Sequence, residues 1–239
     1  MKWSKALSLG DLRLEAGDCK GAIKYFKKAL VIAQKNGSKK EESESDARLG
    51  SVYLEIENYH EAVEYYGKGL EIVQETGDKK LECEICCHIG EACEKLGDYK
   101  KFMEYSKQGF KVAIRIGDSS LIAMSYRGLG RAYHCLCDCQ NSIKCYKKAI
   151  YLYKQLKNDK GLGICYSNMS LLYQMQGKFH DAIRLREESF LITVKTGNKE
   201  SLAAELNNLG TMYARLNNIN KATELLQKCL TISKEINSK

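Results

Sequence analysis

The chain has 239 residues, no proline, 11 cysteines and a formal net charge of +8 at pH 7. The lack of proline argues against polyproline segments and Pro-rich linkers, and the charge excess is too mild to indicate nucleic acid or an anionic membrane as the partner. No apolar run approaches the roughly 18 residues of a membrane span, and an odd cysteine count without a secretion signal predicts a reducing, cytoplasmic location.

The sequence repeats every 40 residues. The same position of all six copies holds a small residue: Gly10, Gly50, Gly90, Gly130, Ser170 and Gly210. Two later columns are apolar in every copy: Leu30, Leu70, Phe110, Ile150, Phe190 and Leu230, followed by Ile32, Ile72, Val112, Leu152, Ile192 and Ile232. A fixed period of this length indicates an array of identical supersecondary units.

Each copy is predicted to form two helices. In the second copy, one run of helical spacing ends at Glu57-Asn58, and a second amphipathic run continues from Ala62 to Val73. In most copies a glycine suited to the left-handed conformation ends the second helix and a capping residue follows it: Gly37-Ser38, Gly77-Asp78, Gly117-Asp118 and Gly197-Asn198. The fourth copy ends with Lys157-Asn158-Asp159 instead, so we expect a looser turn there. The predicted copies form a single array over 1–239, with approximate boundaries at 1–37, 38–77, 78–117, 118–157, 158–197 and 198–239.

The small column predicts close helix packing. A glycine inside a helix costs about 1 kcal/mol relative to alanine, so a fixed glycine needs a compensating contact. We expect Gly50 on the first helix to face Ala62 on the second. The third copy has Phe102 in place of this alanine and Ser106 one turn later, where other copies have an aromatic residue. We interpret this exchange as a swap that conserves core volume.

The pattern Leu-Gly-x-x-Tyr, Gly-Asp-Tyr, Ala-x-x-x-Tyr/Phe and small-Leu/Ile resembles the tetratricopeptide repeat (TPR) over essentially the whole chain. The resemblance implies an all-α, right-handed superhelical solenoid whose first helices line a concave surface where partners bind. The usual TPR unit has 34 residues, and the 40-residue units here resemble the longer variety of the Pins/LGN adaptors. Their Asn-Leu-Gly-Asn core is approached at Asn168-Met169-Ser170 and Asn208-Leu209-Gly210.

The sequence contains none of the common catalytic motifs, so we predict a non-enzymatic protein without a cofactor. Gly128-x-Gly130 lacks the third glycine of a dinucleotide site. Eight cysteines form two clusters: Cys83, Cys86, Cys87 and Cys93, and then Cys135, Cys137, Cys139 and Cys145. Cys86 and Cys145 fall in core columns, so we predict that they pack as small apolar residues. A metal held by Cys137 and Cys139 in the turn between helices is the alternative.

Residues of the first helices that are not used for packing predict the lining of the concave groove. In copies one to three this lining is mostly acidic: Asp11, Glu15, Glu44, Glu55, Glu84, Glu91 and Glu94, against Arg48 and Lys95. In copies four to six the same columns are basic or amide-rich. We therefore predict that an extended and acidic peptide binds to the second half, because amides pair with backbone groups and arginines with carboxylates. The predicted peptide-binding residues are Arg127, Arg131, His134, Asn168, Leu171, Met175, Asn207, Asn208 and Arg215.

Three alternatives remain open on the sequence alone. A charged concave face can simply be solvated. A nucleic acid could bind the lysines of the second helices, but these lie beside acids such as Glu41 and Glu42, which makes this partner unlikely. Weak self-association is the third alternative. Terminal repeats normally need a polar outer face, and no polar capping helix is obvious here. The chain is then expected either to associate with itself or to be a segment of a longer, multidomain protein.

Overall fold

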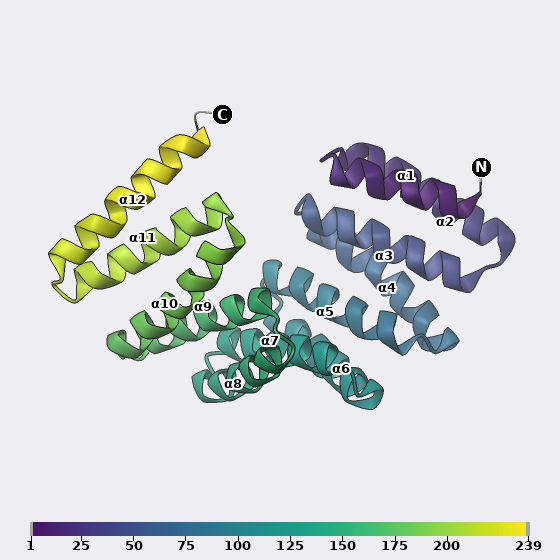
Figure 1. Ribbon diagram of the computed structural model, residues 1–239. Coiled ribbons are helices and arrows are strands. Elements are labelled where there is room, and N and C mark those ends of the chain that lie inside the picture. Colours follow the sequence, from purple (N-terminus) through teal and green to yellow (C-terminus); the bar gives the residue numbers. More distant parts are fainter. Residues whose placement is uncertain (1, 238–239) are drawn as a thin grey trace. The chain divides into compact units, whose positions relative to one another are not determined.

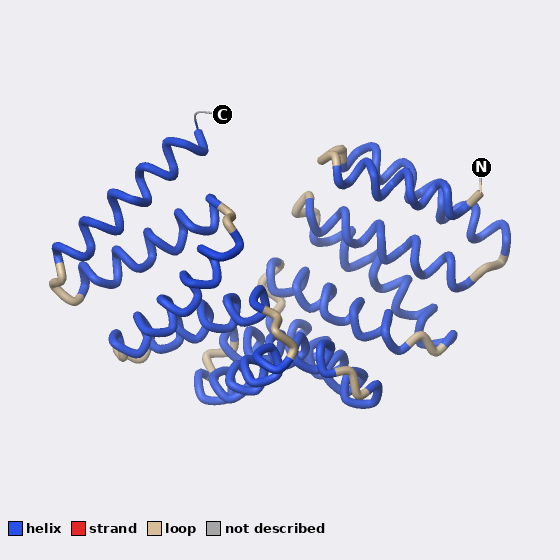
Figure 2. The backbone as a smooth tube through the Cα atoms, viewed as in Figure 1, coloured by secondary structure: helices blue, strands red, loops and turns tan. Residues whose placement is uncertain are grey.

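The structure, a computed structural model, describes residues 2–237, and all the regular elements in that range are α-helices joined by short turns (Figures 1 and 2). The helices are α1 (Trp3–Glu15), α2 (Cys19–Asn36), α3 (Lys39–Glu55), α4 (Tyr59–Thr76), α5 (Lys79–Lys95), α6 (Tyr99–Ile116), α7 (Ser119–Cys135), α8 (Cys139–Gln155), α9 (Asp159–Met175), α10 (Phe179–Thr196), α11 (Lys199–Arg215) and α12 (Ile219–Asn237). The predicted all-α chain of six helix-turn-helix repeats is confirmed.

Contacts within the chain divide it into two compact units. One unit ends at Leu136 and contains α1 to α7, and the other begins at Cys137 and contains α8 to α12. The boundary lies in the turn between the two helices of the fourth copy. The single array over 1–239 therefore stays a prediction, and each unit is described by itself below.

Local hydrogen bonds explain where the helices begin and end. Asp18 and Asp98 accept backbone N–H groups at the start of α2 and α6, at 2.9 and 3.0 Å. Gly37 has a φ of 65° and ends α2 in the left-handed conformation, as its position predicts. The turn between α8 and α9 is one residue longer than the other turns between copies. Lys157 takes the left-handed conformation there with a φ of 52°.

In the first three copies the small column accommodates a ring from the second helix of the same copy. A Cβ added to Gly50 would lie 2.7 Å from the Tyr66 ring. The side chain nearest to Gly50 is therefore Tyr66, whereas we expected Ala62. In the third copy, a Cβ on Gly90 would lie 3.2 Å from Phe102 and 3.7 Å from the Ser106 hydroxyl. Phe102 thus takes over part of the space of the missing aromatic residue, as the volume swap predicts.

One carboxyl group lies inside the core of the first unit. Asp46 on α3 is only 3% exposed, and its Oδ1 has no hydrogen-bond partner among the described residues. Other copies have Ala6 or Cys86 at this position. Burial, and to a lesser extent the charge of Glu42, raise the pKa of Asp46 to about 7.

The left-handed turn positions predict a gain in stability. Glu57 has a φ of 60° at the position where Gly97 stands in the next copy. A non-glycine residue in this conformation costs about 1–2 kcal/mol, partly offset by the greater unfolded-state entropy of glycine. Glu57→Gly should therefore raise the free energy of unfolding by about 0.5–1 kcal/mol in urea titrations, and Gly97→Ala should lower it. Equal effects of both variants would contradict this account.

Asp46 predicts a pH dependence of folding. Between about pH 4 and pH 7 the folded carboxyl holds a proton that the unfolded chain, with an Asp pKa of about 3.9, has lost. The free energy of unfolding should fall as the pH rises through this window, by up to about 1.4 kcal/mol per pH unit. In urea titrations, Asp46→Asn should match the wild type near pH 4 and exceed it at pH 8. A difference that stays constant with pH would refute this prediction.

Candidate functional site

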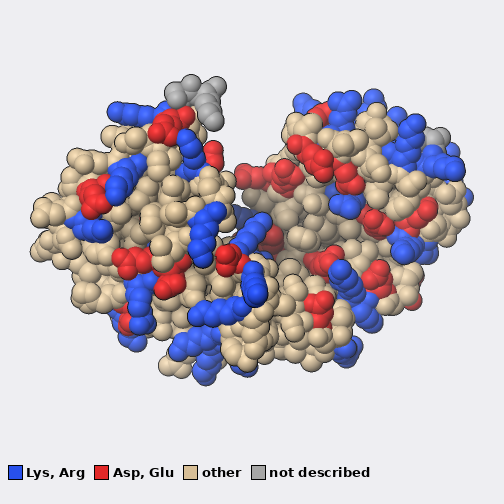
Figure 3. Space-filling model, in the orientation of Figure 1, with Lys and Arg blue, Asp and Glu red and all other residues tan. Residues whose placement is uncertain are grey.

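The first helices of the amino-terminal unit bring two of the predicted acidic residues around one cavity. Glu44 on α3 and Glu84 on α5 line a cavity of about 390 Å³ together with Arg48. The guanidinium of Arg48 also pairs with Asp11 on α1 at 3.4 Å. In the view of Figure 3, acidic and basic side chains are interspersed on the surface of each unit.

Arg127 and Arg131, which we predicted to bind an acidic ligand, both lie on α7. The Arg131 guanidinium pairs with the carboxylate of Glu94 on α5, with Nε 3.3 Å from Oε1. It also lies 5.8 Å from the centre of the Phe102 ring. The charge of Arg131 is therefore balanced inside its own unit. This contact modifies the predicted separation into an acidic and a basic half, because Glu94 belongs to the former and Arg131 to the latter.

Arg127 makes no ion pair among the described residues, but its field reaches Glu91 on α5. A hydrogen bond from His88, and then the charges of Arg131 and Arg127, hold the pKa of Glu91 below its usual value. Burial lowers the pKa of His134 on the same helix as Arg127. Near neutral pH, His134 is therefore a neutral hydrogen-bonding group.

The other six predicted residues lie in the carboxy-terminal unit. Asn168 on α9 lines a cavity of about 490 Å³ between α9, α10 and α11. Leu171 and Met175 on α9 are 42% and 58% exposed, although both are apolar. The remaining three lie on α11, where two are exposed and one is half-buried: Asn207, Arg215 and Asn208.

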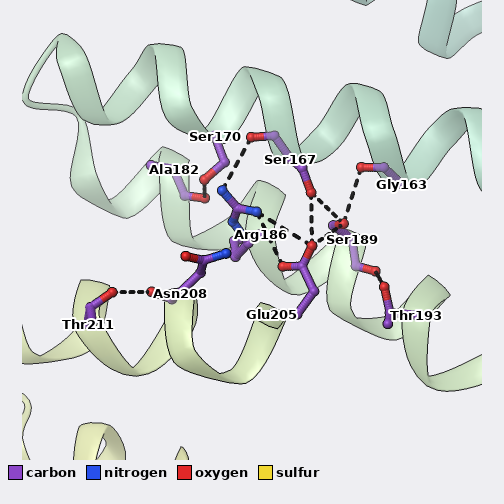
Figure 4. A network of polar contacts seen from close by, with 10 residues as sticks. All are labelled: Gly163, Ser167, Ser170, Ala182, Arg186, Ser189, Thr193, Glu205, Asn208 and Thr211. Carbon is purple, nitrogen blue, oxygen red and sulfur yellow. Dashed lines mark hydrogen bonds and ion pairs between the residues drawn. The ribbon is translucent and has the colours of Figure 1, made fainter. Parts of the chain in front are cut away.

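A buried polar network lies beside these residues and was missed by the sequence analysis (Figure 4). The guanidinium of Arg186 on α10 pairs with the carboxylate of Glu205 on α11, Nη1 to Oε2, at 3.4 Å. The hydroxyl groups of Ser167 and Ser189 each donate a 3.0 Å hydrogen bond to Glu205 Oε1. Arg186 and Glu205 are both buried, so each charge is compensated within the unit.

The repeat columns contained a signal for this network. Arg186 stands in the column that is aromatic at Phe26, Tyr66 and Tyr146. Glu205 stands in a column that holds Ile85 and Cys165 elsewhere. Two charges of opposite sign in core columns of neighbouring helices predict a buried pair.

None of the cysteines, all of which lie within residues 2–237, forms a disulfide. Cys83 and Cys86 are fully buried, and burial raises the pKa of Cys86 to about 12, which makes its thiol inert. Cys137 is exposed in the turn between α7 and α8, with a φ of 60°. Residues 2–237 contain no group of three or more His, Cys, Asp or Glu side chains that could bind a metal ion.

Comparisons with known proteins identify the kind of protein. A family model described as the SusR N-terminal TPR domain matches residues 18–239. A comparison with curated sequences gives no match. None of the described helices is long and apolar enough to span a membrane.

Several solved structures have a similar fold. BtubC (BKLC) from P. vanneervenii is 17% identical, with 92% of this chain and 93% of that chain covered and a TM-score of 0.80. The apo form of RapI is 13% identical over 99% of both chains, with a TM-score of 0.78. A Rap protein complexed with Competence and Sporulation Factor is 12% identical, with 99% of this chain and 76% of that chain covered and a TM-score of 0.70. At these identities the likeness shows the fold, which is a TPR-like solenoid.

The network around Arg186 predicts a non-additive pair of substitutions. Glu205→Ile alone should lower the free energy of unfolding by about 3–5 kcal/mol, because it leaves the Arg186 charge buried without a partner. Arg186→Leu combined with Glu205→Ile uses residues that other copies have in these columns, and should be close to the wild type. Urea unfolding of the two single variants and the double variant measures the coupling. Additive losses would show that the two charges do not interact.

Proposed function

Because the chain belongs to the family of SusR N-terminal TPR domains, we propose that it is a non-enzymatic scaffold that binds an extended, acidic segment of a partner protein along its first helices. TPR repeats in general are protein-interaction scaffolds that use extended surfaces for recognition. A structural neighbour, the Rap protein, was crystallised in complex with Competence and Sporulation Factor. This complex supports binding as the role of such a fold.

The exposed face of α9 and α11 is the observation that carries the proposal. Leu171 and Met175 are apolar side chains that water reaches, and apolar groups of a partner would be buried there. Asn168 and Asn207 offer both donors and acceptors to an extended backbone, whose own groups are unpaired. Arg215 is exposed and forms no ion pair with any described residue, so it is available to a carboxylate.

The charges of the first helices in each unit favour an acidic partner. Glu205, the acid nearest the middle of α11, is neutralised by Arg186 inside the unit. In the amino-terminal unit, Arg127 is the arginine of α7 without an ion pair, whereas Arg131 is held by Glu94. In this proposal Arg127 binds the ligand directly, and Arg131 shapes the wall beside it. His134 adds a hydrogen-bonding group in the amino-terminal unit, and Asn208 adds one in the carboxy-terminal unit.

The proposal also covers the cellular location of the protein and the variety of its repeat. None of the eleven cysteines, which all lie in residues 2–237, forms a disulfide, and this supports a reducing, cytoplasmic location. Helices of 17 and 18 residues from α2 to α11 support the longer repeat variety of the Pins/LGN adaptors.

The proposal can be tested with a fluorescein-labelled peptide of twelve residues that has Glu at every second position. Fluorescence anisotropy should show that it binds more tightly than the same peptide with Lys, and that its affinity falls as the salt concentration rises. Arg215→Glu should weaken binding at least about fivefold, which corresponds to about 1 kcal/mol.

The matched control is Arg184→Glu on α10. This side chain is 76% exposed and the change of charge is the same, but the residue lies on a second helix. It should leave the affinity within about twofold of the wild type. Equal losses in both variants would contradict binding along the first helices, and binding of the Lys peptide alone would contradict an acidic ligand.

A further inference from the structure

The junction between α6 and α7 lacks a pair of rings that the preceding junction has. Tyr66 on α4 stacks on His88 on α5, with ring centroids 5.3 Å apart and ring planes 10° apart. Forty residues later, the same two columns hold Ser106 on α6 and Gly128 on α7. A Cβ added to Gly128 would lie 3.8 Å from the Ser106 hydroxyl, so these two positions still face each other.

Phe102 replaces only part of the missing volume. Its ring lies over Gly90, between α5 and α6, where Tyr66 lies over Gly50 in the preceding copy. The space toward α7 remains open as a cavity of about 60 Å³, and Phe102, Met124 and Cys87 contribute its apolar wall. The cavity therefore lies where these two columns both lack a ring, although Phe110 and Tyr126 still form a ring contact elsewhere in the junction.

The walls of this cavity are held in place. Arg131 lies over the Phe102 ring and is fixed by its two contacts with Glu94. Ser106, which also lines the cavity, is buried. Arg127 and Glu91 line it too, and Arg127 forms no ion pair among the described residues.

We propose that this cavity receives the end of a Leu, Ile or Val side chain from the partner segment, with an acidic residue next to it in that segment. The inference rests on the proposed function and specifies the partner further. An engineered cavity of about 150 Å³ holds benzene, so a volume of about 60 Å³ excludes the whole ring of Phe or Trp and admits a branched aliphatic group. The apolar wall favours such a group over water, and Arg127 pairs with the neighbouring carboxylate.

The test uses three labelled acidic peptides that differ only at one central residue, which is Leu, Ala or Trp. In anisotropy titrations, the wild type should bind the Leu peptide about tenfold more tightly than the other two, because burying a Leu side chain contributes on the order of 1.5–3 kcal/mol. In protein labelled at the methionine methyl groups, the Leu peptide should also shift the Met124 resonance, and the Ala peptide should not.

Two variants fill the cavity. Ser106→Tyr with Gly128→His copies the ring pair of the preceding junction, and Ser106→Leu fills the space with one change. Both should reduce the affinity for the Leu peptide to that for the Ala peptide. Lys107→Leu, on the exposed side of the same helix, is the control and should keep the preference. Circular dichroism checks that each variant is helical.

The outcomes separate the two proposals. Three results would contradict binding of an aliphatic side chain in this cavity while leaving peptide binding intact. They are equal binding of all three peptides by the wild type, a Met124 methyl resonance that does not shift, and a preference for Leu that persists in the folded filled variants. If the wild type binds none of the three peptides, both the proposed function and the proposed role of this cavity are wrong.

Discussion

The close approach of the two helices within each copy is the contact on which the rest of the structure depends. Gly50 lets the Tyr66 ring lie where a Cβ would otherwise be. The same ring then stacks on His88 of the next copy. One small residue thus determines both the packing inside a pair and the contact with the following pair. Where the ring is absent, as at Ser106, the junction keeps its helices and leaves a cavity instead.

Internal ion pairs determine which charges are available to a partner. Glu94 holds Arg131 across α5 and α7, and Glu205 holds Arg186 across α10 and α11. A count of charged residues along the sequence therefore overstates the free arginines. Arg127 and Arg215 remain without such pairs among the described residues, and the binding of an acidic segment that we propose rests mainly on them.

The helices could be predicted from the sequence because their ends depend on local signals. Glycine at a left-handed turn and Asp or Asn at a cap act within a few residues, and the 40-residue period repeats them six times. The contacts of Arg131 and Arg186 join residues that are 37 and 19 positions apart, so helical spacing within one copy does not reveal them. Asp46 was missed although its column holds Ala6 and Cys86 in other copies; it packs near Gly69 on α4, where an added Cβ would lie 3.6 Å from the Asp46 Cβ. The proposed binding residues share the first helices, but the units that carry them pack separately.

The turn between α8 and α9 has a consequence for how such chains can grow. α8 is one residue shorter than α6, its turn is one residue longer, and α9 still begins 40 residues after α7. From α2 onward, each helix of one type therefore starts in phase with its counterparts despite a different joint. A 40-residue cassette excised or duplicated between equivalent points would rejoin in frame with intact joints on either side. Recombination of the coding sequence between equivalent points would therefore change the chain by whole repeats in one step, and no product would contain a partial repeat.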